Sequence, residues 1–143
     1  MKSKKIIIGS RRSKLALIYA ERAKSEIMKF SQISGIEDVE IKGITTKGDI
    51  MQNIRLSDLG GKGLFSKTIE DELLDKKIDI AVHALKDMPS DETEGLTTNC
   101  FLKRNDPREI LISKDNKHIK DLAPNAIIGT SSIRREFQLK KIR

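Results

Sequence analysis

Aromatic residues and cysteine are scarce in this chain of 143 residues. Phe, Tyr and Trp together make up 3% of the sequence, so the chain offers almost no surface for stacking nucleic-acid bases. The one cysteine, Cys100, excludes a disulfide within the chain. No apolar run approaches the length of a membrane span, and the apolar run after the basic start is too short for a signal peptide. We therefore expect a cytoplasmic protein without nucleic-acid or membrane partners.

Charged residues are abundant, at 34% of the sequence, with a formal net charge of +7. A basic chain favours acidic partners, but lysines spread over solvated faces explain the total equally well. Basic and acidic residues alternate instead of forming a block, which also argues against nucleic acid. No cluster of His, Cys or carboxylates has the spacing of metal ligands, so we predict no metal site.

Short apolar runs alternate with helical patterns along the chain. Strands are predicted at residues 6–8, 39–44 and 78–82, and further strands are expected at 96–102, 110–112 and 126–128. Three helices are predicted. The first is capped by Ser13 and has an apolar stripe of Ala16, Ala20, Ala23, Ile27 and Phe30. The second carries Phe65, Ile69 and Leu73 on one face, and the third spans residues 132–141. Residues 45–63 are expected to form a long loop. This alternation predicts an α/β fold with a mixed, largely parallel sheet.

Four segments at expected strand ends carry candidate functional side chains: residues 10–13, 45–47, 83–87 and 130–135. The carboxyl ends of parallel strands share one edge of a sheet, where ligands bind in α/β folds. Three of the four segments combine Lys or Arg with Ser or Thr, which indicates a site for a small anion carrying carboxylates or phosphates.

The last of these segments offers the most donors. A tight turn at Gly129 is followed by the hydroxyls of Thr130, Ser131 and Ser132 and by two arginines, Arg134 and Arg135. An ordinary Ser cap with solvated arginines is the alternative.

The other segments leave similar alternatives open. For Arg11 and Ser13 a capped helix with surface arginines is as good an interpretation as an anion site. Lys86 and Asp87 form either a surface pair or an anion holder beside a group that stabilises a cation or moves a proton. His83 is expected to be a hydrogen-bonded structural histidine. The glycines around Lys62 lack the Ser or Thr of a phosphate loop and suggest a flexible lid.

Five blocks carry a resemblance to one family: GSRRSKLAL at 9–17, GGKGLF at 60–65, DIAVHALKDMP at 79–89, RNDPR at 104–108 and GTSSIRR at 129–135. In order and spacing they resemble the porphobilinogen deaminase (hydroxymethylbilane synthase) family. The resemblance implies a transferase of porphyrin and haem biosynthesis that joins four porphobilinogen molecules head to tail, releases ammonia, and primes on a covalently bound dipyrromethane cofactor.

The resemblance also implies site residues. Asp87 matches the catalytic aspartate, which stabilises a cationic intermediate. Matches to cofactor-binding positions are Lys86, Asp87, Thr130, Ser131, Ser132, Arg134 and Arg135, and matches to substrate-binding positions are Arg11, Ser13 and Lys62. Asp58 stands where some relatives carry a loop lysine. Cys100 matches a different position from the cysteine that anchors the cofactor.

By the family pattern, residues 1–98 form most of a first domain like those of periplasmic binding proteins, 99–104 cross over, and 105–143 begin a second, similar domain. The rest of that domain and a third domain with the anchoring cysteine are expected outside this chain. The chain alone is then expected to lack turnover and to self-associate through uncovered surfaces, whereas full-length members are usually monomers. The alternative is a non-catalytic module that binds a small polycarboxylate.

Overall fold

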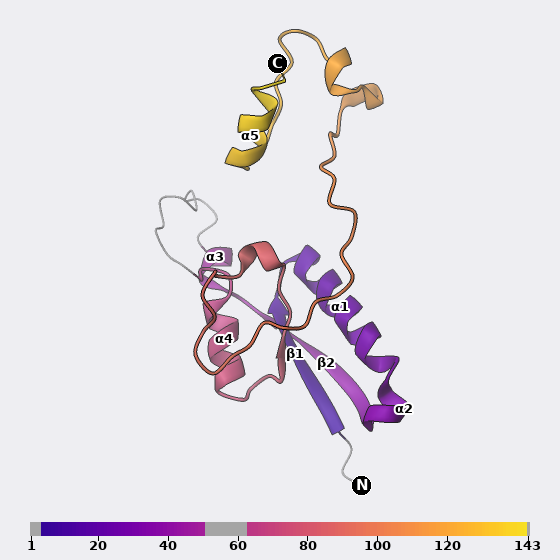
Figure 1. Ribbon diagram of the computed structural model, residues 1–143, viewed down its shortest axis with the longest axis vertical. Coiled ribbons are helices and arrows are strands. Elements are labelled where there is room, and N and C mark those ends of the chain that lie inside the picture. Colours follow the sequence, from indigo (N-terminus) through magenta and orange to yellow (C-terminus); the bar gives the residue numbers. More distant parts are fainter. Residues whose placement is uncertain (1–3, 51–62, 143) are drawn as a thin grey trace. The chain divides into compact units, whose positions relative to one another are not determined.

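The chain divides into two units, Met1–Leu102 (unit 1) and Lys103–Arg143 (unit 2). The computed structural model describes residues 4–50 and 63–142 (Figure 1). Lys62 and Asp58, and with them most of the predicted lid, lie outside the described residues. Among the residues described, no helix combines the length and apolar character needed to cross a membrane.

Unit 1 is built on a parallel sheet. Strands β1 (Lys4–Arg11), β2 (Ile36–Ile44) and β3 (Ile80–Ala81) lie in the order β2-β1-β3, and β1 pairs in parallel with both neighbours. Helix α1 (Lys14–Met28) connects β1 to β2, and α4 (Lys67–Leu74) precedes β3. The predicted α/β fold with a parallel sheet is confirmed.

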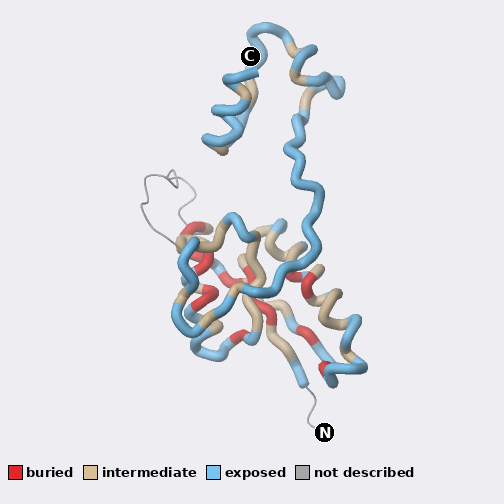
Figure 2. Tube along the Cα trace, in the orientation of Figure 1, coloured by how far each residue is buried: buried red, intermediate tan, exposed pale blue. Residues whose placement is uncertain are grey.

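The two faces of the sheet are covered by different helices, with α1 on one side and α4 on the other (Figure 1). Because successive side chains of a strand point to opposite faces, Ile8 packs with Ala20 and Val39 on the α1 side. Ile7 packs against the cluster of Ile69 and Ile78 on the α4 side. These positions account for much of the buried (red) chain in Figure 2. The short apolar run at the start of the sequence is therefore buried from both sides.

Helix α1 begins where the sequence predicts and ends earlier. The Ser13 side chain accepts a hydrogen bond from the backbone N–H of Ala16, at 3.3 Å, which caps the first turn. The expected stripe holds for Ala20 and Ala23, which are buried, but it is wrong for Phe30, which is 61% exposed. The chain leaves α1 after Met28 and forms α2 (Ser31–Ser34), which ends at Gly35 with a left-handed φ of 68°.

The segments that follow β2 and β3 at the same edge of the sheet are short helices. The expected loop at 45–63 contains α3 (Lys47–Ile50), and the segment after β3 contains a 3-10 turn, η1 (Leu85–Asp87). Strand β3 is shorter than predicted, although the backbone N–H groups of Asp79 and Val82 donate to carbonyls of β1 on either side of it.

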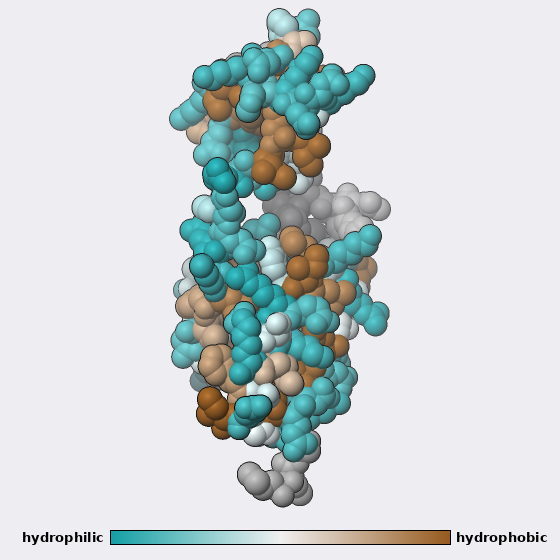
Figure 3. Space-filling model, turned by 90° about the vertical axis from the view of Figure 1, so that its right-hand side faces the viewer, coloured by the Kyte–Doolittle hydropathy of each residue, from teal (hydrophilic) through white to brown (hydrophobic). Residues whose placement is uncertain are grey.

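Unit 2 contains two 3-10 turns, η2 (Lys114–Asn116) and η3 (Ile119–Asp121), and one α-helix, α5 (Ile133–Leu139). The strand expected at 96–102, in unit 1, and those expected at 110–112 and 126–128, in unit 2, are wrong, since these residues form no strand in the structure. A strand needs a hydrogen-bonded neighbour, and the described part of unit 2 provides none. Ile112 and Ile127 are accordingly 89% and 99% exposed, and Figure 3 shows hydrophobic side chains (brown) at the surface.

Candidate functional site

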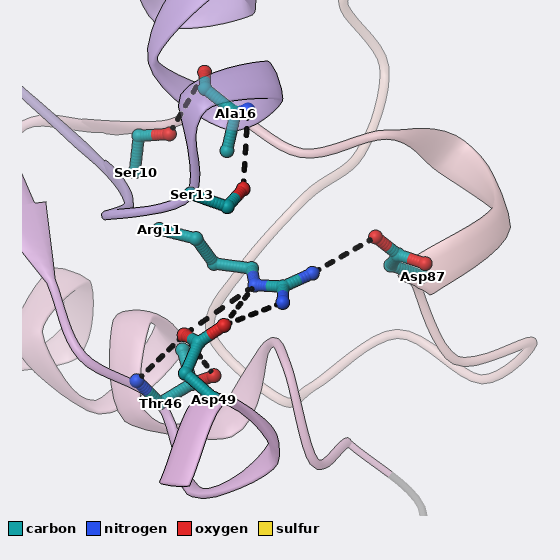
Figure 4. A network of polar contacts seen from close by, with 7 residues as sticks. All are labelled: Ser10, Arg11, Ser13, Ala16, Thr46, Asp49 and Asp87. Atoms are coloured by element: carbon teal, nitrogen blue, oxygen red, sulfur yellow. Dashed lines mark hydrogen bonds and ion pairs between the residues drawn. The ribbon is translucent and has the colours of Figure 1, made fainter. Parts of the chain in front are cut away.

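Three of the four predicted segments meet at the carboxyl-terminal edge of the unit 1 sheet (Figure 4). Arg11 ends β1, Asp49 lies in α3 after β2, and Asp87 lies in η1 after β3. The Arg11 guanidinium lies between the two carboxylates, with Nη2 2.5 Å from Asp49 Oδ1 and Nη1 3.6 Å from Asp87 Oδ2. The three side chains are only 17–23% exposed, so these charges interact with little screening by water. The cluster is therefore not purely basic: one arginine is shared by two acids.

Asp49 holds the arginine firmly. Its carboxylate accepts hydrogen bonds from Arg11 Nε at 3.1 Å and from the backbone N–H and hydroxyl of Thr46 at 3.0 and 2.7 Å. Burial by itself raises the pKa of Asp49, but the hydrogen bonds from Arg11 and Thr46 outweigh burial and bring this pKa below its ordinary value. Asp49 is thus an ionised anchor that fixes the direction of Arg11.

The ring of Phe65 completes the setting of Arg11. The guanidinium carbon lies 3.9 Å from the ring centroid, within the range of a cation–π contact. The ring also packs against Gly48, where an added Cβ would come within 2.3 Å of a ring carbon. Phe65 was expected on one face of a helix with Ile69 and Leu73, but it precedes α4, which begins at Lys67. A glycine in α3 therefore gives the ring room to reach the arginine.

Two further predicted site residues of unit 1 lie near this edge. The oxygen of Ser13 caps α1, which leaves its O–H free to donate to another acceptor. Lys86 lies in η1 beside Asp87 and is exposed. An exposed ammonium next to a half-buried carboxylate places opposite charges side by side at the sheet edge.

His83 differs from its expected role. Its Nε2 is buried and has no hydrogen-bond partner among the residues described, so the prediction of a hydrogen-bonded histidine is not met at this atom. Burial lowers the pKa of His83, against the opposing effects of Glu70 and Asp87. Within residues 4–50 and 63–142, no group of three or more His, Cys, Asp or Glu is arranged to hold a metal ion.

The fourth segment belongs to unit 2. Thr130 Oγ1 accepts from the backbone N–H of Ser132 at 3.2 Å, and Ser132 Oγ caps α5 by accepting from that of Arg135 at 3.4 Å. Both hydroxyls accept within the segment and keep their O–H hydrogens for an outside acceptor. Ser131 is exposed between them.

The two arginines of α5 meet a carboxylate, Glu109, that was not among the predicted site residues. Glu109 contacts Arg134 Nη2 through Oε1 and lies 2.8 Å from Arg135 Nε through Oε2. The hydrogen bond from Arg134, together with the charge of Arg135, holds the pKa of Glu109 below its ordinary value.

Asp49 was also missed, although the sequence contains a signal for it. Thr46-Lys47-Gly48-Asp49 has the pattern of a capping box, in which Thr and an acid three residues later bond to each other's backbone N–H. The structure shows one half of that exchange, from the Thr46 N–H to Asp49. No comparable local pattern marks Glu109.

Known proteins resemble the chain over almost its whole length. A family model described as "Porphobilinogen deaminase, dipyromethane cofactor binding domain" matches residues 6–143. The porphobilinogen deaminase of Bacillus mycoides (strain KBAB4) is 50% identical over 136 residues, which cover 95% of this chain and 43% of that protein. The enzymes of the same name from Bacillus pumilus (strain SAFR-032) and Geobacillus kaustophilus (strain HTA426) are 49% and 48% identical, each over 94% of this chain and 42% of the relative. The chain thus spans less than half the length of these relatives.

Proposed function

The chain belongs to the porphobilinogen deaminase family, and from this premise we propose that it forms the cofactor- and substrate-binding part of an enzyme of tetrapyrrole biosynthesis. The proposed reaction joins four porphobilinogen molecules head to tail into hydroxymethylbilane and releases ammonia. The alternative is a module that binds a small polycarboxylate without chemistry.

The position of Asp87 carries this proposal. A site that only bound polyanions would gain nothing from a carboxylate, yet Asp87 lies at the sheet edge with its oxygen 3.6 Å from Arg11 and its side chain 23% exposed. A carboxylate held in this way stabilises positive charge that develops on a reacting pyrrole. Arg11 is directed by Asp49, so it holds Asp87 in place while two of its five N–H groups remain for a ligand.

The polar side chains of unit 2 suit a ligand with several carboxylates. Thr130, Ser131 and Ser132 bring hydroxyls, and Arg134 and Arg135 bring guanidinium groups, from one short segment. Guanidinium groups bind carboxylates through charge-assisted, often bidentate hydrogen bonds, and hydroxyls add further donors. They fit the acid side chains of a dipyrromethane, which when bound supplies the primer for chain growth. For unit 1 we propose, from the family resemblance, that Lys86 binds acid groups of the cofactor and that Arg11, Ser13 and Lys62 bind substrate. Cys100, exposed in unit 1, is not proposed as the anchor.

The test uses a chimera in which residues 1–143 replace the corresponding part of the Bacillus mycoides relative. We expect the chimera to consume porphobilinogen and release ammonia, and the isolated chain to show no sustained turnover. Asp87→Asn should abolish turnover while leaving cofactor bound. Asp71→Asn is the matched control, because Asp71 is exposed on α4, and it should remain active.

Two results would contradict the proposal. Sustained turnover by the isolated chain would show that it needs no further segment. Full activity of the Asp87→Asn chimera would remove the proposed catalytic role and favour the binding module.

A further inference from the structure

One carboxylate in unit 2 joins two arginines that are neighbours in the sequence. The oxygens of Glu109 contact Arg134 Nη2 and Arg135 Nε, the latter at 2.8 Å. Glu109 comes from an extended segment 25 residues before Arg134. The contact therefore ties the segment around Glu109 to α5.

The geometry of a helix makes this contact informative. Consecutive residues of an α-helix point about 100° apart, and neighbours at i and i+1 do not face each other. Arg134 and Arg135 are consecutive within α5 (Ile133–Leu139), yet both guanidinium groups reach the same carboxylate. Glu109 therefore holds together two cationic groups that the helix alone would spread apart.

The neighbouring charges leave Glu109 available for this contact. Arg108, the adjacent residue, is held by Asp106, with Nε 2.9 Å from both carboxylate oxygens. Glu109 contacts one nitrogen of each α5 arginine, and Arg134 Nη1 donates to Gln138 at 3.2 Å. Other N–H groups of both guanidinium ions remain for a ligand, since each ion carries five.

We propose that Glu109 is a positioning residue that brings Arg134 and Arg135 together into one receptor for ligand carboxylates. The inference rests on the proposed function, in which these arginines bind the acid groups of the cofactor. The side chains of the three residues are 44–61% exposed, and ion pairs this exposed contribute little to folding. The contribution of Glu109 is to order two long side chains before the ligand arrives, which reduces the entropy lost on binding.

This role predicts an effect opposite to simple electrostatics. Removing a negative charge from an anion site should strengthen anion binding, whereas loss of a positioning residue should weaken it. We expect Glu109→Ala to weaken the binding of a free dipyrromethane, whose acid groups these arginines are proposed to bind, by about two- to tenfold, the range for ordering one long side chain.

The experiment measures the binding of a free dipyrromethane, which carries the acid groups of the cofactor, to the 143-residue chain by titration calorimetry, and follows the arginine Nε–Hε signals by NMR. Asp115→Asn is the matched control, because it removes the same charge from an exposed position of unit 2 whose φ of 63° asparagine tolerates. Affinity should be unchanged in this variant. Glu109→Gln, which keeps the length of the side chain, should weaken binding less than Glu109→Ala and serves if the alanine variant fails to fold.

A positioning role is separated from a general structural one in the Arg134→Gln background. With one arginine gone there is no pair to bring together, so Glu109→Ala should then have little further effect. An equal loss in both backgrounds, or tighter binding by Glu109→Ala, would overturn the positioning role alone. Binding that is insensitive to both Arg134→Gln and Arg135→Gln would instead overturn the proposed carboxylate site, and the role of Glu109 with it.

Discussion

Replacing Asp49 by asparagine tests whether the cluster around Arg11 is held together as the structure shows. The substitution keeps the shape of the side chain but removes its charge. It also replaces one carboxylate oxygen, which in the wild type accepts from Arg11 or Thr46, by an amide N–H₂ group that cannot accept. Two hydrogen bonds from Arg11, at 3.1 and 2.5 Å, lose a charged acceptor. A hydrogen bond to a charged group contributes about 1.5–3 kcal/mol.

Two features reduce the total effect. Arg11 keeps Asp87 as a second partner, and both side chains of the Arg11–Asp49 pair retain some contact with water, at 20% and 17% exposure. We therefore expect Asp49→Asn to destabilise unit 1 by about 1–3 kcal/mol, roughly half of the undiscounted sum. In urea this corresponds to a midpoint lower by about 1–2 M for a domain of this size.

The chain offers a convenient probe for this measurement. It has one Tyr and no Trp, and Tyr19 lies in α1, so tyrosine fluorescence during a urea titration reports on unit 1 alone. The control is Asp38→Asn, which removes an exposed partner of Lys5 at 3.8 Å and should leave the midpoint unchanged. A double-mutant cycle with Arg11→Gln should show a coupling of about 1 kcal/mol or more. Equal midpoints for the two asparagine variants, or strictly additive effects in the cycle, would refute this account of the cluster.

Three further predictions concern the same edge of unit 1. Gly48→Ala should destabilise unit 1 by about 1–3 kcal/mol through overpacking against Phe65, and NMR should show the ring displaced; an unmoved ring would contradict the contact. Ser13→Ala should cost about 1 kcal/mol through loss of the α1 cap, measured by the same urea titration, whereas Ser25→Ala, within α1 and exposed, should cost nothing measurable. The pKa of Asp49 is lowered in the folded chain, so its stabilising effect should be complete above the ordinary aspartate pKa of about 3.9 and be lost as the pH falls further. The difference in unfolding free energy between wild type and Asp49→Asn should therefore shrink at low pH, and a constant difference would argue against an ionised Asp49.

Several features of unit 1 were predictable because they depend on residues close together in the sequence. The short uninterrupted apolar run at 6–8 predicts a buried strand, since both of its faces are apolar, and Ser13 predicts the start of α1, since a hydroxyl there satisfies a free N–H. The placement of Arg11 and Asp87 at one edge followed from the rule that parallel strands end on the same side. The structure confirms the sheet and the cap.

Other features were missed for physical reasons. Isolated apolar runs at 110–112 and 126–128 have the composition of strands, but a strand forms only beside a partner, and the described residues of unit 2 contain none. Phe65 has the spacing of a helix face, yet its ring packs on Gly48 and Arg11 instead. In both cases the outcome depends on what lies nearby in space.

The sequence by itself thus determined the alternation of strands and helices, the cap at Ser13 and the family to which the chain belongs, because each is written in short blocks of adjacent residues. Only the tertiary structure decided that Asp49 directs Arg11 toward Asp87, and that Glu109 joins Arg134 to Arg135. Arg11 and Asp49 are 38 residues apart in the sequence, and Glu109 and Arg134 are 25 residues apart. Charged side chains so far apart in the chain become partners only when folding brings their segments together, and no local pattern specifies which acid will meet which arginine.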